Sequence, residues 1–195
     1  MDISYLNIGF AMTGSFCTFS RVIPEIRTLT ELGADVYPIM SEMAYSTDTR
    51  FGKSADFIRT IKEMTGREII HSISAAEPIG PKHYLDALVV APCTGNTITK
   101  MASGITDSCV SMAAKAHLRN GRPLVVAIST NDALSNCAKN IGMLMNVRNV
   151  YFVPFNQDDP VKKPNSLVAD MQMIAPTLEK ALDGIQIQPM FSERR

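Results

Sequence analysis

The chain has no surplus of charge, because its 195 residues contain 19 basic and 19 acidic side chains. Without a net charge, no global electrostatic attraction draws the protein toward nucleic acid or an anionic membrane. Long apolar runs are also missing, and none approaches the roughly 18 residues that cross a bilayer. The sequence therefore predicts neither a nucleic-acid partner nor a membrane partner.

A secretory leader and paired cysteines are missing as well. Residues 1–5 show no basic segment ahead of a long apolar stretch, so we expect no signal peptide. The cysteines form no CxxC pair, which is typical of free thiols in a cytoplasmic protein. They are Cys17, Cys93, Cys109 and Cys137. The three histidines have no histidine partner three or four residues away, so the pattern does not predict a metal site.

The chain does have an ordinary globular composition, with 46% hydrophobic and 19% charged residues. Short apolar runs alternate with longer helical stretches. We expect strands over residues 6–11, 35–40, 69–70, 87–91, 124–128 and 150–153, and helices over about 16–32, 55–64, 96–103, 107–119, 133–144 and 166–182. The polar stretch 156–165 is typical of a loop.

Strands separated by helices imply right-handed crossovers, and hence an α/β fold with a three-layer, doubly wound, mostly parallel sheet of the Rossmann-like type. The length suits one domain over residues 1–185, followed by a tail over 186–195 that we expect to be loose after Pro189. Pro24 predicts a kink or a helix start, and Pro38 predicts a strand near the sheet edge. Ligands of such sheets bind beyond the carboxyl ends of the strands.

Small polar residues follow the first two expected strands. Thr13, Gly14 and Ser15 stand where the first strand turns into a helix, and free amides at a helix start suit a phosphate. An ordinary tight turn is the alternative, because small polar residues are common there. Ser41 follows the second strand, where it either caps the next helix or contributes to the same phosphate site.

The most specific motif runs from residue 91 to residue 107. A buried strand ends at Pro92, and a cluster of small polar residues then opens a helix that stops at Gly104. Backbone amides and the side chains of Thr94, Asn96 and Thr97 converge on the end of that strand. This arrangement suits the polar rim of a flat heterocycle or its ribityl chain.

In their order and spacing these three motifs resemble the flavoprotein superfamily that contains FMN-dependent cysteine decarboxylases and flavin prenyltransferases. The resemblance extends to about residue 182. It implies FMN as cofactor, held at subunit contacts in a homo-oligomer, either a trimer or a dodecamer. The cofactor-binding residues that it implies are Thr13, Gly14, Ser15, Ser41, Pro92, Thr94, Asn96, Thr97 and Ser129.

The chain departs from both known chemistries of that superfamily. Residues 77–81 occupy the stretch where the decarboxylases carry a catalytic histidine. Ser129 and Thr130 replace an arginine–glutamate pair of the prenyltransferases, and Met112 replaces a basic residue before it. The sequence therefore identifies no catalytic residue.

Four segments resemble one subfamily in particular, namely residues 9–16, 91–107, 127–136 and 154–166. That resemblance implies a chain that works beside a dehydrogenase-like A subunit in sporulating bacteria, converting dihydrodipicolinate into the small dicarboxylate dipicolinate. Aromatisation is a two-electron oxidation, so a redox nucleotide suits it. Two other hypotheses stay open: an independent flavin-dependent decarboxylase or prenyltransferase, and a scaffold subunit without catalysis.

Several side chains near the expected pocket have two interpretations each. Cys93 is either a packed core thiol or a reactive group at the flavin edge. Lys162 and Lys163 form either a solvated loop or a contact for a substrate carboxylate. Asn131 and Asp132 follow the strand at 124–128, so they face the pocket, although Asp132 also suits the cap of the next helix.

Overall fold

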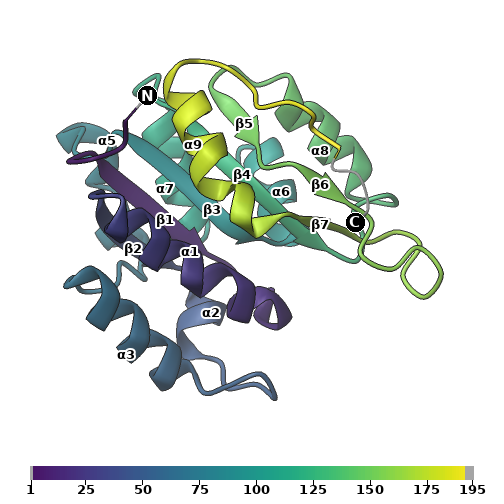
Figure 1. Cartoon of the computed structure of the whole chain (residues 1–195), viewed down its shortest axis with the longest axis horizontal. Helices are drawn as coiled ribbons and strands as arrows, with labels where there is room; N and C mark the ends of the chain where they lie inside the picture. The colour runs from purple at the N-terminus through teal and green to yellow at the C-terminus, as the bar shows by residue number, and fades with distance from the viewer. Residues whose placement is uncertain (1, 192–195) are drawn as a thin grey trace.

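A seven-stranded sheet runs through the middle of the molecule in the computed structural model, which describes residues 2–191 (Figure 1). The strand order is β2-β1-β3-β4-β7-β6, and β5 also pairs with β4. The parallel strands are β1 (Asn7–Met12), β2 (Asp35–Met40), β3 (Ala87–Cys93), β4 (Leu124–Thr130) and β5 (Val150–Phe152). Two short antiparallel strands complete the sheet, β6 (Phe155–Asn156) and β7 (Leu167–Ala169). The predicted α/β fold with a mostly parallel sheet is confirmed.

Helices cover both faces of this sheet. Figure 1 shows α1 (Phe19–Glu31) and α9 (Ile174–Leu182) in front of it, and α6 (Gly95–Ala102) and α7 (Cys109–Leu118) behind it. The remaining helices are α2 (Glu42–Ser46), α3 (Ser54–Thr65), α4 (Ile73–Ala76), α5 (Ile79–Lys82) and α8 (Ala138–Met145), with two 3-10 turns, η1 (Phe16–Thr18) and η2 (Met171–Met173). Within residues 2–191, no helix combines the length and apolarity that crossing a bilayer requires.

The continuous apolar runs are the central strands, as predicted. All residues of β3 are buried, and so are those of β4 except the last. A strand covered on both faces by helices cannot alternate between apolar and polar residues, which explains these unbroken runs. The strand that contains Pro38 lies at the edge, where a missing amide is tolerated. The short strand expected at 69–70 is a single bridge between Ile70 and Ile39.

Three sequence-based expectations about helices were wrong. Helix α1 runs unbroken through Pro24, whose ring is exposed and so meets no packed neighbour. Helix α8 begins at Ala138, because residues 131–137 form a turn in which Asp132 O accepts from the Ser135 and Cys137 amides, each at 3.2 Å. Asp132 is therefore not the cap of α8.

The largest correction concerns the stretch 166–182, which was expected to be one helix. Its first part is strand β7, paired antiparallel with the end of β4 and with β6, so that only α9 from Ile174 onward is α-helical. The tail is also more ordered than expected as far as Phe191. The Phe155 amide donates to Met190 O at 3.1 Å, and the Phe155 and Phe191 rings lie 5.3 Å apart. The expected tail residues 192–195 lie outside the described residues.

Two glycines on the surface should respond in opposite directions to alanine. Gly33 has a φ of +87° just after α1, and an added Cβ would lie 3.2 Å from the Ser4 Cβ. Gly142 lies inside α8 with no atom within 4 Å of an added Cβ. We expect Gly33→Ala to lower the free energy of unfolding by about 1–2 kcal/mol and Gly142→Ala to raise it by about 0.5–1 kcal/mol. Urea denaturation checks both, and equal effects of the two substitutions would contradict the assigned backbone conformations.

Candidate functional site

A cleft of ≈ 340 Å³ opens at the carboxyl ends of the parallel strands, the edge at which ligands of such sheets bind. Its walls come from the turn after β1, the starts of α1 and α6, the end of β4, and the segment between β6 and β7. The residues lining it are Gly14, Ser15, Cys17, Thr18, Arg21, Thr94, Ser129, Thr130, Asn131, Asp158, Lys163 and Val168. Segments far apart in the chain therefore meet at one polar opening.

Three hydroxyl groups form a closed cluster in one wall of the cleft. The Ser15 and Ser129 Oγ atoms are 2.8 Å apart, and Ser129 Oγ is 2.8 Å from Thr18 Oγ1. Ser15 Oγ and Thr18 Oγ1 complete the triangle at 3.2 Å. Each hydroxyl can donate once and still accept, so the three satisfy one another without a net charge. We call this set the hydroxyl triangle.

Thr13 fastens the turn after β1 to the turn after β3. Its side chain is 1% exposed, and Oγ1 donates to Pro92 O at 2.6 Å while accepting from the Thr94 amide at 3.0 Å. Both hydrogen-bonding capacities that such a buried hydroxyl needs to use are therefore occupied within the protein. The Thr13 hydroxyl fixes the relative position of two loops, and Gly14 and Ser15 rather than Thr13 line the cleft.

The start of α6 is held by its own threonines. Thr94 caps the helix by accepting from the Thr97 amide, and the two hydroxyls are 3.2 Å apart. A Cβ on Gly95 would lie 2.8 Å from Thr130 Oγ1, so only glycine lets this helix start approach the end of β4 so closely. Asn96 is exposed on the first turn of α6 and does not line the cleft.

Ser41 acts as a helix cap in this structure, which was one of its two predicted roles. Its Oγ accepts from the Ala44 amide at 3.3 Å, and its own amide donates to Met12 O at 2.9 Å. The second bond ties the end of β2 to the end of β1. Ser41 thus lies at the strand edge that bears the other predicted residues, outside the lining of the cleft.

Two cations line the cleft, and they differ in their surroundings. Lys163 pairs with Asp158 at 3.1 Å, and this carboxylate raises the pKa of the lysine. Arg21 is exposed on α1, and no carboxylate of residues 2–191 forms an ion pair with it. Lys162, the other lysine of the loop, does not line the cleft.

The structure favours the packing interpretation of Cys93. The side chain is fully buried in β3, and burial raises the pKa of its thiol far above the usual value. A thiol must ionise to act as a nucleophile, so this cysteine is poorly suited to the task. Cys17 is the exposed cysteine in the cleft, 4.0 Å from Ser15 Oγ.

The structure brings four of the nine predicted cofactor-binding residues into the cleft lining, namely Gly14, Ser15, Thr94 and Ser129. Thr13, Pro92 and Thr97 are buried, and Ser41 and Asn96 lie outside its lining. Sequence reasoning missed Thr18 and Arg21. Their spacing of three residues from Ser15 to Thr18 to Arg21 was the available signal, because it places all three near one side of a helical turn.

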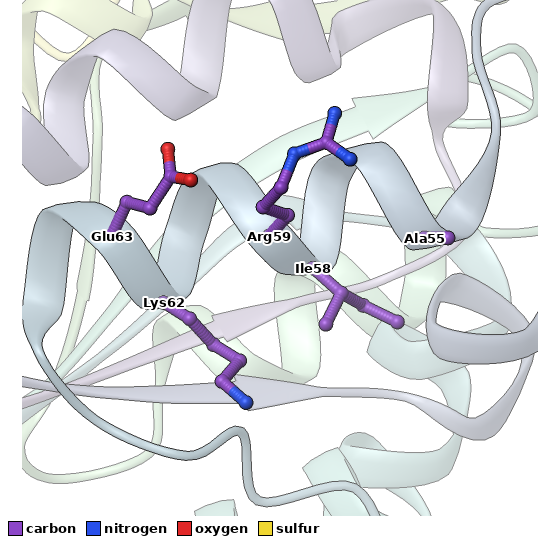
Figure 2. A pocket seen from close by; sticks show the side chains of 5 residues that line it. All are labelled: Ala55, Ile58, Arg59, Lys62 and Glu63. Carbon is purple, nitrogen blue, oxygen red and sulfur yellow. The ribbon is translucent and has the colours of Figure 1, made fainter.

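A second hollow lies on the outer surface of α3, away from the strand ends (Figure 2). It is lined by Ala55, Ile58, Arg59, Lys62 and Glu63, all from that one helix. Figure 2 shows the Arg59 and Glu63 side chains pointing away from those of Ile58 and Lys62, so the polar groups do not converge. The hollow therefore offers no site comparable with the cleft.

Comparison with known proteins agrees with this geometry. The chain is 51% identical to the B subunit of dipicolinate synthase from Bacillus subtilis over 186 residues, which cover 95% of this chain and 93% of the relative. It is 32% identical to a flavin prenyltransferase of Archaeoglobus fulgidus, over 66% of this chain and 70% of the relative. The crystal structure of the corresponding dipicolinate synthase chain, the B subunit from Bacillus halodurans, matches with a TM-score of 0.92 and 49% identity over 100% of both chains. The family model described as Flavoprotein matches residues 2–184, and the chain belongs to the flavoprotein family.

Proposed function

We propose that this chain is the FMN-binding B subunit of a dipicolinate synthase, which acts with an A subunit to convert dihydrodipicolinate into dipicolinate. The observation that carries the proposal is the 51% identity to the Bacillus subtilis protein over 95% of the chain. At that level of identity over so much of the chain, a shared fold and a shared site are the simplest expectation. The cleft at the strand ends gives the proposal a location.

The residues at the strand ends fit the polar part of FMN. Gly14 forms no hydrogen bond with another described residue, so its amide is available to an acceptor at the start of η1. Ser15 and Thr94 add hydroxyl groups from two neighbouring loops. The cleft volume of ≈ 340 Å³ lies near the lower end of the roughly 300–1,000 Å³ of small-molecule sites. We infer that one chain holds part of the cofactor and that a second copy covers the rest.

In this proposal the flavin would be held by Gly14, Ser15, Ser41, Thr94 and Asn96, with Thr13, Pro92 and Thr97 setting the positions of those loops. The aromatisation removes two electrons and two protons from the substrate ring. A bound flavin supplies a two-electron acceptor. Ser129 and Thr18 present hydroxyl groups in the same cleft, where they orient a polar substrate edge.

The first test is the flavin content of the purified full-length chain. We expect a yellow protein, or a colourless one that takes up FMN and quenches its fluorescence upon titration. A chain that neither carries nor takes up FMN would instead support the scaffold hypothesis. The experiment therefore separates a cofactor-binding subunit from a structural one.

The second test is dipicolinate production by the two proteins, separately and together. We expect dipicolinate only when both this chain and the A subunit are present. Production by this chain alone would contradict the need for a partner. Prenylation of FMN by this chain alone would identify it as an independent prenyltransferase, which the similarity to the archaeal enzyme makes the natural second candidate.

A further inference from the structure

We propose that Arg21 and Lys163 form the carboxylate-binding pair for a dicarboxylate substrate, with Asp158 limiting the affinity. This inference rests on the proposed function, because it assigns the substrate side of the same cleft. Both cations line the cleft and come from different elements, Arg21 from α1 and Lys163 from the loop between β6 and β7. Figure 1 shows that loop projecting at the edge of the sheet beyond β7.

Arg21 has an unused charge in a polar cleft. Several of the chain's other cations form ion pairs, among them Arg59 with Asp56 and Arg122 with Asp86. Within the described part of the chain, Arg21 has no such partner, and it remains exposed at the opening. A guanidinium group binds a carboxylate through two parallel hydrogen bonds, so a ligand carboxylate suits this position.

Lys163 is held in place by the loop that carries it. Its amide donates to Asp159 O at 2.7 Å, and Gln157 Nε2 donates to Pro164 O at 2.8 Å across the loop. The Lys163 ammonium group reaches Asp158 at 3.1 Å, with half of its side chain exposed. A ligand carboxylate can therefore approach the ammonium group from the solvent side while Asp158 remains bound to it.

The hydroxyl triangle cannot supply the charge that a dicarboxylate requires. Its three members, Ser15, Thr18 and Ser129, satisfy one another and carry no charge. The charged groups lining the cleft are Arg21, Lys163 and Asp158, whose sum is one positive charge. A dianion therefore meets one uncompensated cation and one shared cation, and removal of the Asp158 charge would leave two.

Two substitutions with opposite expected signs test this assignment. Binding of dipicolinate to the full-length chain loaded with FMN is measured by titration calorimetry. We expect Arg21→Gln to raise the dissociation constant of dipicolinate by about 10- to 100-fold, because it removes a charge-assisted pair of hydrogen bonds. We expect Asp158→Asn to lower it by roughly 3- to 10-fold, because Lys163 is no longer shared.

Arg27→Gln is the matched control, since Arg27 is also an exposed arginine of α1 but does not line the cleft. It should leave dipicolinate affinity unchanged. Picolinate, which has a single carboxylate, should bind the unmodified chain more weakly than dipicolinate and should lose less affinity in Arg21→Gln.

The outcomes separate this inference from the proposed function. If the unmodified chain holds FMN but binds no dipicolinate, or if Arg21→Gln and Arg27→Gln behave alike, the carboxylate pair is wrong and the flavoprotein assignment stands. If Arg21→Gln weakens FMN binding instead, the arginine serves the flavin phosphate and the inference is overturned. If the unmodified chain does not bind FMN at all, the proposed function itself fails.

Discussion

Thr13→Val is expected to lower the free energy of unfolding by about 2–3 kcal/mol, although the two side chains have nearly the same shape. The Thr13 hydroxyl is buried and makes two hydrogen bonds, to Pro92 O and from the Thr94 amide. Valine leaves the Thr94 amide without its acceptor, and an unsatisfied group is what makes such a loss costly. Pro92 O loses less, because the Thr13 amide also donates to it at 3.2 Å.

The same substitution should weaken FMN binding about tenfold, because the loops after β1 and β3 lose the bond that sets their relative position. Urea denaturation and FMN titration measure the two effects. Thr13→Ser keeps the hydroxyl and should restore most of both. Thr28→Val removes a peripheral bond within α1, to Pro24 O at 3.3 Å, and should change stability by no more than about 0.5 kcal/mol. Equal stability of Thr13→Val and Thr28→Val would contradict the role of Thr13 as a fastener between loops.

The sequence allows the central part of this fold to be predicted, because its strands are specified locally. Strands β3 and β4 are unbroken apolar runs, and burial on both faces requires that pattern. Helix ends at Gly33 and Gly66 are also local, since both glycines adopt the positive φ that ends a helix. These features needed no knowledge of the rest of the chain.

Strand β7 could not be predicted in this way, because its pairing partners are distant in the chain. Leu167 and Val168 pair with Thr130 and Ser129 at the end of β4, and Val168 also pairs with Asn156. Taken alone, the stretch from Ser166 onward is apolar and rich in residues that favour helices, so helix was the natural expectation. Tertiary pairing overrode that local preference.

The candidate site shows the same division. Gly14, Ser15 and Thr94 were predicted because strand ends and helix starts can be located from the sequence. Thr18 was missed because its role depends on Ser129, which is 111 residues away in the chain. Lys163 was named with two interpretations, and its place in the cleft depends on the fold of its own loop. Residues that act through distant partners require coordinates.

His117 should make the protein lose stability in mild acid. Its side chain is fully buried in α7, Nε2 donates to Pro123 O at 3.0 Å, and Nδ1 has no partner among the described residues. Burial lowers the pKa of this imidazole to about 4 from the ordinary value of 6.5. The charged form is therefore disfavoured in the folded protein and accessible in the unfolded chain.

This difference sets the direction and the window of the effect. Above pH 6.5 neither state binds the proton, and the full stability is present. Between pH 6.5 and about 4 the unfolded chain binds a proton that the folded protein does not, so the free energy of unfolding falls as the pH falls. The loss from this residue amounts to about 3 kcal/mol across the window, and it stops growing below the folded pKa.

His117→Leu isolates this contribution from that of the carboxylates that titrate nearby. Pro123 O keeps a donor in the variant, because the Leu88 amide also reaches it at 3.0 Å, so leucine leaves no acceptor unsatisfied there. We expect the variant to differ little from the unmodified protein at pH 7 and to be more stable by about 3 kcal/mol near pH 4. Urea denaturation at intervals of pH gives the difference curve, with His71→Leu as the comparison at an exposed histidine. Parallel curves for His117→Leu and the unmodified protein would mean that His117 binds its proton equally well folded and unfolded, and that it is not sealed in the core as the structure places it.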